Sequence, residues 1–327
     1  MGKLLWGILF FSLSVVKVDA NNNNDIIFEK NNKITFPTAE VLNEFTTRIP
    51  FKLIDHLIVI EAALLNKKGN FIIDTGSKTL ILNKIHFPSK YSHRKKRKET
   101  SGVLDIIEDT DTRKLKEFIL QNFNLKNKDS DIIDLSHIEK AKKMNLLGII
   151  GYSILRDYEV FIDMHLHQIT LTKVDKFGNT LDKKVYAEKF TDTISFKLKK
   201  HTIVLDTYIN KQKLKFGLDS AAEYNQINKN SSKKALKYFF PSKRIILTGA
   251  SKNTIEVMAG KLYRVRLSET TYCGPMITLL TNLTKMSEAF GTQLDGILGY
   301  EFLRQKRTII NYQKEKLYFV DYPIIIH

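Results

Sequence analysis

The chain carries two copies of one segment, and this internal repeat limits the folds that it can adopt more than any other feature. Residues 49–74 align without a gap with residues 194–219, at an offset of 145, and ten of these 26 positions are identical. A second match, between residues 148–156 and 296–304, follows at an offset of 148. Because both matches keep their order along the chain, the sequence predicts two homologous lobes. Their predicted boundaries are 45–180 and 181–327.

Both copies are expected to be mainly β. Each contains two runs rich in Ile, Val and Leu that are separated by a short polar turn, which is the pattern of a β-hairpin. The second run of each hairpin ends at an aspartate, Asp74 or Asp219. Helical periodicity is rare, so the helices should be few and short. The first strands of the two hairpins are expected at 57–65 and 202–209, and the turns at 66–70 and 210–213. Short helices are expected at 136–144, 153–157, 234–240 and 301–305.

The net charge of +17 suggests a polyanionic partner if it is taken alone. However, the basic clusters are spread over both copies and lack the interleaved aromatic residues that stack on nucleic-acid bases. We therefore expect no nucleic-acid partner. A protein that binds nucleic acid or an acidic surface through its basic side chains is kept as the least favoured of three functional classes; the other two follow from the motifs described below. The basic clusters are residues 94–98, 197–200, 211–215 and 304–307.

Residues that often bind metals are few. The single cysteine, Cys273, excludes an intrachain disulfide framework and a cysteine-based zinc site. His56 and His201 occupy equivalent positions in the two copies, and their hairpin setting favours a structural role. His165 and His167 are expected to lie on one side of a strand, where a surface role is favoured over a metal pair. We expect no metal and no cofactor.

The first 20 residues are typical of a secretory signal peptide. Lys3 precedes an apolar run from Leu4 to Val16 that is too short to span a bilayer, and Ala20 closes a suitable cleavage site. Residues 21–44 then form a leader and a first strand region. We therefore expect an exported protein, periplasmic or secreted. No later run is long enough for a transmembrane span.

The first hairpin ends in the sequence Phe71-Ile-Ile-Asp-Thr-Gly-Ser77. Its strand buries two apolar residues and presents the carboxyl group of Asp74 at the strand end. Thr75 can fix the turn with its hydroxyl group, and Gly76 allows a close backbone approach. Ser77 can donate a hydrogen bond to the outer oxygen of Asp74. The motif therefore predicts a carboxylate held in a rigid turn.

The second copy has Asp219-Ser220-Ala221-Ala222 at the equivalent position. Two copies related by a twofold axis would bring Asp74 and Asp219 together. Two carboxyl groups at one site cannot both ionise easily, so one pKa rises and the pair titrates as a unit. Such a pair can hold a water molecule and act as general base and general acid in turn.

On these motifs, the chain resembles the aspartic proteases over most of residues 45–325, and looks closest to exported bacterial proteins with retropepsin-like domains. The resemblance implies a mainly β, bilobal pepsin-like fold, made of two retropepsin-like β-barrel lobes with short helices. It implies an endopeptidase in which Asp74 and Asp219 activate a water molecule, and a peptide or protein as the substrate. Both lobes are in one chain, so a dimer is not required.

The resemblance also implies supporting parts. Gly151 and Gly299, from the repeated apolar-apolar-glycine motif, should pack beneath the catalytic turns. A flap hairpin should lie between the aspartate and the glycine motif of at least one lobe. Its candidate positions are Gly102 and Gly249, and the flap tyrosine of pepsin has no identifiable counterpart.

One departure from the family pattern affects the second turn. Ala221 stands where the family has a glycine, and a methyl group there costs about 1 kcal/mol at a positive φ angle but little at a negative one. Ala222 also lacks the hydroxyl group that Ser77 supplies. The alternative function is therefore a catalytically impaired protease fold that binds peptides without cleaving them. For an active dyad, we expect mildly acidic pH to be favoured over strongly acidic pH.

Overall fold

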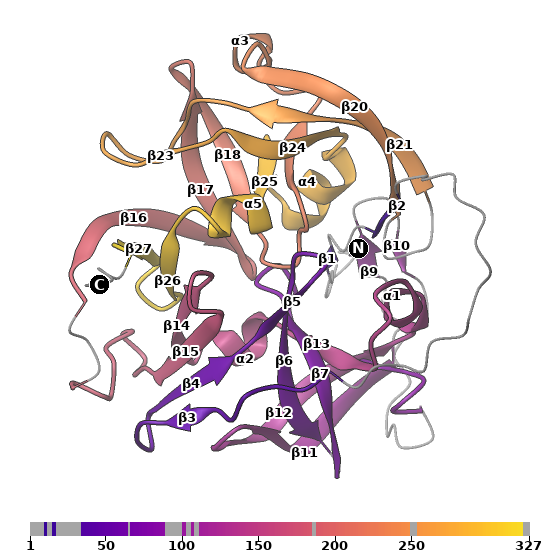
Figure 1. Ribbon diagram of the computed structural model, residues 1–327, viewed down its shortest axis with the longest axis vertical. Coiled ribbons are helices and arrows are strands. Elements are labelled where there is room, and N and C mark those ends of the chain that lie inside the picture. Colours follow the sequence, from indigo (N-terminus) through magenta and orange to yellow (C-terminus); the bar gives the residue numbers. More distant parts are fainter. Residues whose placement is uncertain are drawn as a thin grey trace, which may run out of the picture.

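The computed structural model describes residues 10–11, 15–17, 34–64, 66–88, 100–102, 106–107, 111–184, 188–248 and 254–322. Strands account for 54% and helices for 9% of the structure, so the mainly β class expected from the sequence is confirmed. Figure 1 shows the strands of the N-terminal half, in indigo to magenta, below those of the C-terminal half, in orange to yellow. No helix among these residues is long and apolar enough to cross a membrane.

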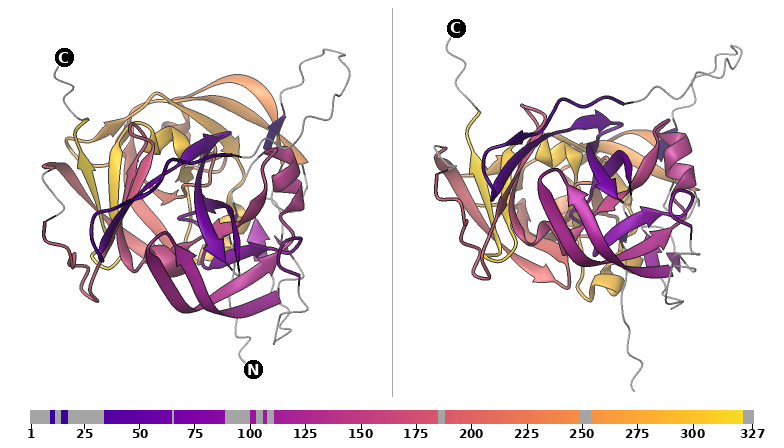
Figure 2. Two further views of the ribbon diagram at one scale, coloured as in Figure 1. Left: turned by 60° about the horizontal axis from the view of Figure 1, so that its bottom comes forward. Right: turned by 90° about the horizontal axis from the view of Figure 1, so that it is seen from below.

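Six strands of the N-terminal half form a closed barrel. The repeated hairpin supplies two of them, and the pair Ile119 and Ala63 closes the barrel between its first and last strands. Figure 2 brings this barrel forward. In order around the barrel, the strands are β6 (Leu57–Leu64), β7 (Lys67–Ile73), β13 (Leu146–Ile150), β8 (Leu80–Asn83), β12 (Phe123–Ile133) and β11 (Asp111–Leu120), and β5 (Lys52–Ile54) pairs with β6.

The C-terminal half repeats this order of pairing. Its strand β25 lies parallel to β18 and antiparallel to β19, as β13 lies with β7 and β8. The duplication read from the sequence therefore extends to the hydrogen-bonded ladders. The strands are β17 (Thr202–Ile209), β18 (Gln212–Leu218), β25 (Gly296–Leu298), β19 (Asn225–Asn228), β24 (Met276–Thr281), β21 (Thr254–Leu262) and β20 (Phe239–Thr248), while β22 (Val265–Arg266) pairs with β17 and β23 (Tyr272–Cys273).

A sheet joins the two halves, and three adjacent strands from each half form its main part. At its centre β14 pairs with β26, and Phe161 lies opposite Ile309, its own equivalent at the offset of 148. This pair therefore marks a local twofold axis. The strands in order are β4 (Thr46–Pro50), β15 (Gln168–Lys173), β14 (Tyr158–Asp163), β26 (Arg307–Asn311), β27 (Lys316–Val320) and β16 (Phe190–Lys199), and β3 (Glu40–Val41) pairs with β4.

The helices are short, as expected, but one prediction was wrong. The helix expected over 234–240 ends at Leu236, because Phe239 is buried and begins β20 by pairing with Leu262. Helix α4, near the equivalent place to α1, was not expected. The helices are α1 (Ser136–Ala141), α2 (Tyr152–Leu155), α3 (Lys233–Leu236), α4 (Thr284–Phe290) and α5 (Tyr300–Leu303).

Both hairpin turns are tighter than expected. The polar residues 67–70 continue the ladder with β6, and β18 likewise begins at Gln212. Asn66 and Asn210 adopt positive φ angles of 63° and 49°, a conformation that asparagine tolerates and that matches the twist of a hairpin. Because each asparagine allows a tight turn, the polar residues next to it belong to the strands of the hairpin.

Four short strands lie in the less completely described parts of the chain. β9 (Thr100–Gly102) and β10 (Ile106–Ile107) form an antiparallel pair. β1 (Phe10–Phe11) pairs with β9, and β2 (Val15–Lys17) pairs with β20. β1 and β2 belong to the segment expected to be a signal peptide, whose other residues lie outside the described ones.

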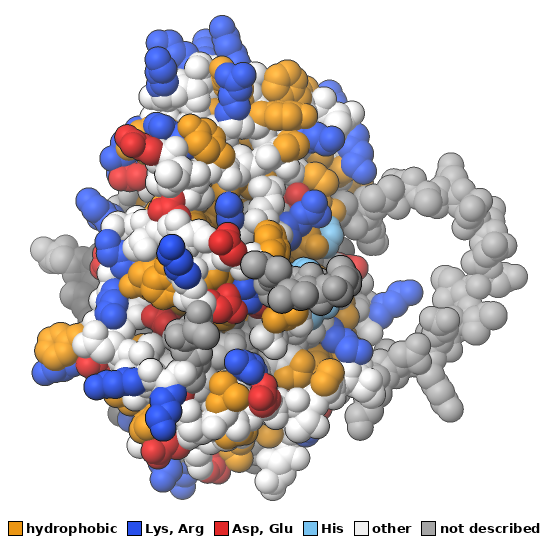
Figure 3. Space-filling model, turned by 60° about the vertical axis from the view of Figure 1, so that its left-hand side comes forward, with side chains coloured by type: hydrophobic (Ala, Val, Ile, Leu, Met, Phe, Trp, Pro, Cys, Tyr) orange, Lys and Arg blue, Asp and Glu red, His pale blue; other side chains and the backbone are white. Residues whose placement is uncertain are grey.

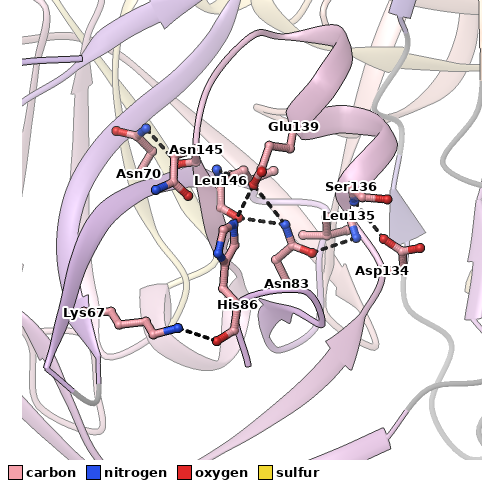
Figure 4. A network of polar contacts seen from close by, with 10 residues as sticks. All are labelled: Lys67, Asn70, Asn83, His86, Asp134, Leu135, Ser136, Glu139, Asn145 and Leu146. Carbon is pink, nitrogen blue, oxygen red and sulfur yellow. Dashed lines mark hydrogen bonds and ion pairs between the residues drawn. The ribbon is translucent and has the colours of Figure 1, made fainter. Parts of the chain in front are cut away.

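A polar network fixes the strand β8 to helix α1 and strand β13 (Figure 4). Asn83 donates a hydrogen bond to Leu146 O at 2.9 Å and accepts one from Leu135 N–H at 3.1 Å. Glu139 Oε2 accepts from Leu146 N–H at 2.9 Å and lies 2.7 Å from His86 Nε2. The ends of three elements are thereby held together.

The C-terminal half reproduces the core of this network with different side chains. Asn228, the equivalent of Asn83, donates to Leu294 O at 3.1 Å. Leu294 N–H donates to Ser287 Oγ at 2.9 Å, where the other half uses Glu139. The asparagine is therefore kept in both copies, while the helical side chain that accepts from the backbone N–H has changed from Glu139 to Ser287.

Buried charges stabilise the central sheet. Arg307 on β26 places its Nε 2.8 Å from Asp163 Oδ2 at the end of β14, and both side chains are nearly inaccessible. Glu188 also binds the guanidinium group, at 2.6 Å. Charges removed from water need such partners, because an unpaired buried carboxylate is strongly destabilising.

We predict that Arg307→Met lowers the free energy of unfolding by about 3–5 kcal/mol, because it leaves Asp163 buried without its cation. Arg244→Met is the matched control: its ion pair with Glu256 is exposed and should contribute about 0–1 kcal/mol. Urea unfolding of both variants at pH 7 measures the difference. Equal, small losses would contradict this account of the sheet.

Candidate active site

The two aspartates stand at equivalent strand ends, and the glycine-motif strands hold both. Asp74 follows β7 and donates its N–H to Ile150 O at 3.0 Å. Asp219 follows β18 and donates its N–H to Leu298 O at 2.9 Å. Since β13 and β25 are themselves buried and paired on both sides, the position of each carboxyl group is set by the barrel strands behind it.

The two turns are hydrogen-bonded to each other across the halves. Thr75 N–H donates to Ser220 Oγ at 3.0 Å, and Ser220 N–H donates to Thr75 Oγ1 at 2.9 Å. Each hydroxyl group then donates to a carbonyl of the opposite strand, Leu218 O at 3.3 Å and Ile73 O at 2.8 Å. All of these groups are buried, so this reciprocal arrangement fixes one turn relative to the other.

The carboxyl groups of Asp74 and Asp219 are brought together and hydrogen-bonded to each other. Their exposed fractions are 0% and 3%. Burial first, and the charge of Asp219 second, raise the pKa of Asp74 well above its usual 3.8, against the donors of Ser77 and Gly76. A hydrogen bond between two carboxyl groups requires a proton on one of them, so we expect the two groups to titrate as one pair.

The donors around the two carboxyl groups differ. Asp74 Oδ1 accepts the N–H groups of Gly76 and Ser77 at 2.8 and 3.0 Å, and its Oδ2 accepts the Ser77 hydroxyl at 2.6 Å. The last contact is the one expected from the sequence. Asp219 Oδ1 accepts the N–H of Ala221 at 2.9 Å, and Ala222 has no hydroxyl group to offer.

The first turn requires glycine because of a close approach. A Cβ atom at Gly76 would lie 2.8 Å from Asp219 Cγ and 2.9 Å from its Oδ2, closer than real Cβ contacts. At the equivalent place, the methyl group of Ala221 joins a buried apolar cluster that includes Ile72 and Ile149. The φ angle of Ala221 is not positive, so the strain considered for this alanine does not arise.

The repeated glycines lie directly behind the turns. A Cβ at Gly151 would be 2.4 Å from Thr79 O, and one at Gly299 would be 2.2 Å from Ala222 O. The next residue of each motif donates its N–H to the turn, from Tyr152 to Ser77 O at 2.8 Å and from Tyr300 to Ala222 O at 2.9 Å. These are close contacts that no other residue type would allow.

The equivalent histidines have diverged in their surroundings. His201 is buried, with its Nε2 3.1 Å from Gly76 O in the first turn. His56 instead stacks on Tyr300 with ring centres 4.2 Å apart, and meets Tyr224 edge-on. Both side chains therefore contact the opposite half beside one of the two aspartate turns.

The expectation that His165 and His167 lie on a strand was wrong. They lie in the turn between β14 and β15, because Asp163 Oδ1 accepts the N–H groups of His165 and Leu166 and closes the turn. Both are exposed. Among the described residues, no group of three His, Cys, Asp or Glu side chains could hold a metal ion. Cys273 is buried, which raises its pKa to about 12.

An ion pair beside the second turn was not foreseen. Lys142 Nζ lies 2.7 Å from Glu223 Oε1 and 3.3 Å from Asp55 Oδ2, and the first two side chains are almost fully buried. Burial raises the pKa of Glu223 to about 7, although Lys142 opposes this. The sequence gives only a weak sign of this ion pair: Glu223 aligns with Lys78 of the first copy, so the charge is reversed between the two copies.

The flap candidates are only partly described. Gly102 is the last residue of β9, which pairs antiparallel with β10. Gly249 lies outside the described residues; β20 and β21, which precede and follow that undescribed segment, pair antiparallel as a second hairpin. The buried face of this second hairpin packs near Tyr224, through Ile245, Leu247, Val257 and Ala259.

Basic side chains are dispersed over the surface shown in Figure 3. Lys and Arg side chains spread from the top of that face to the bottom and alternate with Asp and Glu.

No family model matches the chain, and no curated protein matches it.

We predict that Asp74→Asn stabilises the fold at pH 7 and not at pH 3. A carboxyl group whose pKa is raised by folding binds more protons in the folded state, so stability is lost as pH rises above the unfolded value near 3.8. The uncharged amide removes this loss. Thermal unfolding from pH 3 to 7 measures the effect.

Asp206→Asn is the matched control, because that carboxylate is half exposed and pairs with Lys213 at 2.8 Å. It should not become more stabilising as the pH rises. If Asp74→Asn and Asp206→Asn gave the same pH trend, the raised pKa of Asp74 would be wrong.

Proposed function

We propose that this chain is an aspartic endopeptidase with a bilobal, pepsin-like fold. The observation that carries the proposal is the hydrogen-bonded pair of buried carboxyl groups, Asp74 and Asp219, at the ends of two equivalent strands. The reciprocal bonds between Thr75 and Ser220 support it, because they hold the two turns at a fixed separation. A shared proton gives one acid and one base at a single site.

The arrangement of strands supports the two-lobed assignment. Each half repeats the same ladder around its aspartate, and the central sheet contributes three strands from each half. We assign residues 45–180 and 181–327 to the two lobes, as the repeat suggests. We further propose that residues 1–20 direct export to a periplasmic or secreted location, and that the substrate is a peptide or protein.

The chemistry follows from one proton on two carboxyl groups. The ionised carboxyl group removes a proton from a water molecule, whose oxygen attacks the peptide carbonyl carbon, while the protonated group gives its proton to the carbonyl oxygen. The resulting tetrahedral diol then collapses. One of its hydroxyl protons returns to the dyad, the C–N bond breaks, and the amine leaves with a proton from the dyad. The dyad ends with the one proton it began with.

This mechanism ties activity to the singly protonated pair. Activity should fall when the pair loses its shared proton at high pH and when both groups are protonated at low pH. Because burial and mutual charge raise the pKa of Asp74, the active range should extend toward mildly acidic pH. A rate optimum below about pH 3 would contradict this assignment.

The second candidate is a protease fold that binds peptides without cleaving them. The second turn favours it, since Ala221 and Ala222 replace the glycine and the hydroxyl donor of the family pattern. The negative φ region of Ala221 and its place in the apolar cluster weigh against it. The two candidates differ in one respect only, the chemistry at Asp74 and Asp219.

We predict that the purified full chain cleaves members of a peptide library between pH 3 and 8, and that Asp74→Asn or Asp219→Asn lowers kcat at least about 10³-fold. A statine-containing peptide, which imitates the tetrahedral diol, should inhibit cleavage. Asp206→Asn is the control and should keep wild-type kcat, because its half-exposed carboxylate pairs with Lys213 and Asp206 lies opposite Lys215, four residues before Asp219 on the chain. Peptide binding without cleavage would support the second candidate, and cleavage that survives both active-site variants would contradict the dyad.

A second prediction concerns the asymmetry of the turns. Gly76→Ala should lower kcat about 100-fold, because its Cβ must displace Asp219, and a shift near 1 Å in a reacting group has that effect. Ala221→Gly, the mirror change, should leave kcat equal or higher. Steady-state kinetics with one peptide substrate compares the pair. Equal losses in both variants would mean that the turns are interchangeable, contrary to the close contact at Gly76.

A further inference from the structure

His201 lies between the two halves, next to the first catalytic turn. It belongs to the turn that joins β16 to β17, and only 2% of its surface is exposed. Its Nε2 atom is 3.1 Å from Gly76 O, across the boundary between the copies. Because a carbonyl oxygen can only accept, Nε2 must carry the hydrogen and donate it.

The acceptor is well placed to influence the dyad. The carbonyl of Gly76 and the N–H of Ser77 belong to one peptide group, and that N–H donates to Asp74 Oδ1 at 3.0 Å. A hydrogen bond to the carbonyl polarises the peptide group and strengthens the N–H donor. On its other side, the Cα of Gly76 faces Asp219 so closely that no Cβ fits. His201 therefore touches a peptide group that donates to Asp74 and whose Gly76 Cα lies against Asp219.

We propose that His201 is a positioning residue, which holds the Gly76–Ser77 peptide in place between Asp74 and Asp219 and whose protonation limits activity at acidic pH. This inference rests on the proposed peptidase function. The equivalent His56 does not share this role, because it stacks on Tyr300 instead.

The surroundings of His201 oppose a positive charge. The charged groups that act on it are Lys78, which follows the first turn, and Lys200, its neighbour in the chain. Burial first, then these two cations, lower its pKa to about 4, although the bond to Gly76 acts in the opposite direction. The imidazole is therefore neutral and a fixed donor at mildly acidic pH.

The consequence for stability has a definite sign. The unfolded histidine has a pKa near 6.5, so between pH 6.5 and about 4 the unfolded chain binds more protons than the folded one. Stability is then fully present above pH 6.5 and is lost as the pH falls toward 4. Below about pH 4 an imidazolium would be buried beside two lysines, and we expect the contact with Gly76 to be released.

Two substitutions separate the hydrogen bond from the titration. His201→Gln keeps an N–H donor near the position of Nε2 but does not titrate. We expect kcat at pH 6 to stay within about threefold of wild type, and the acidic limit of activity to move to lower pH. His201→Leu removes the donor and should lower kcat about tenfold or more above about pH 4, where wild type keeps the contact, with little change in KM, which is the effect of one buried hydrogen bond on a rate.

Unfolding measurements test the same residue without reference to cleavage. As the pH falls from 6.5 to 4, the Tm of wild type should drop more than that of His201→Gln, whereas His56→Gln, the repeat-equivalent control, should follow wild type. These Tm profiles distinguish a failure of this proposal from a failure of the peptidase assignment. The proposal is overturned if His201→Gln shows the wild-type Tm profile, if it keeps the wild-type acidic limit, or if His201→Leu keeps wild-type kcat.

Discussion

Two carboxyl groups taken out of water repel each other as anions and attract each other when they share a proton. The pair Asp74 and Asp219 is stable only if the groups meet at hydrogen-bonding distance, and that requirement reaches outward through the structure. The backbone at Gly76 must lie in contact with Asp219, and the hydroxyl groups of Thr75 and Ser220 must each bind the opposite turn. Each aspartate must also be held by the strand behind it, β13 or β25, which accepts its backbone N–H. The closed barrel of the N-terminal half, the repeated ladder of the C-terminal half and the central sheet keep these two strand ends face to face.

The two halves share a scaffold but not an electrostatic environment. The asparagine network at the end of β8 recurs at the end of β19, yet its helical partner is Glu139 in one half and Ser287 in the other. Near the turns, the first copy has Lys78 where the second has buried Glu223, which Lys142 neutralises. A duplicated pair of carboxyl groups in identical surroundings would titrate alike. Divergence of the neighbours therefore gives a symmetric backbone two carboxyl groups in unequal surroundings, as the proposed acid and base would need.

Much of this arrangement could be read from the sequence, because the repeat at an offset of 145 aligned both aspartates and both hairpins. The strands β6 and β17 have nearly the expected bounds, since runs of Ile, Val and Leu bury well on a sheet. The errors have local causes. Phe239 lies in a strand rather than a helix because Leu262 pairs with it, and His165 lies in a turn that Asp163 closes. The contacts of Lys142 and His201 cross between the halves, and no pattern within one copy could reveal them.

The central claim is that one proton is shared between the two buried carboxyl groups. Its most direct test is a titration of the carboxyl carbons in protein labelled with ¹³C at aspartate, with the signals of Asp74 and Asp219 identified from their asparagine variants. The account predicts two widely separated steps common to both signals, with one proton still bound well above pH 3.8. Two independent transitions near the ordinary aspartate pKa of about 3.9 would contradict it.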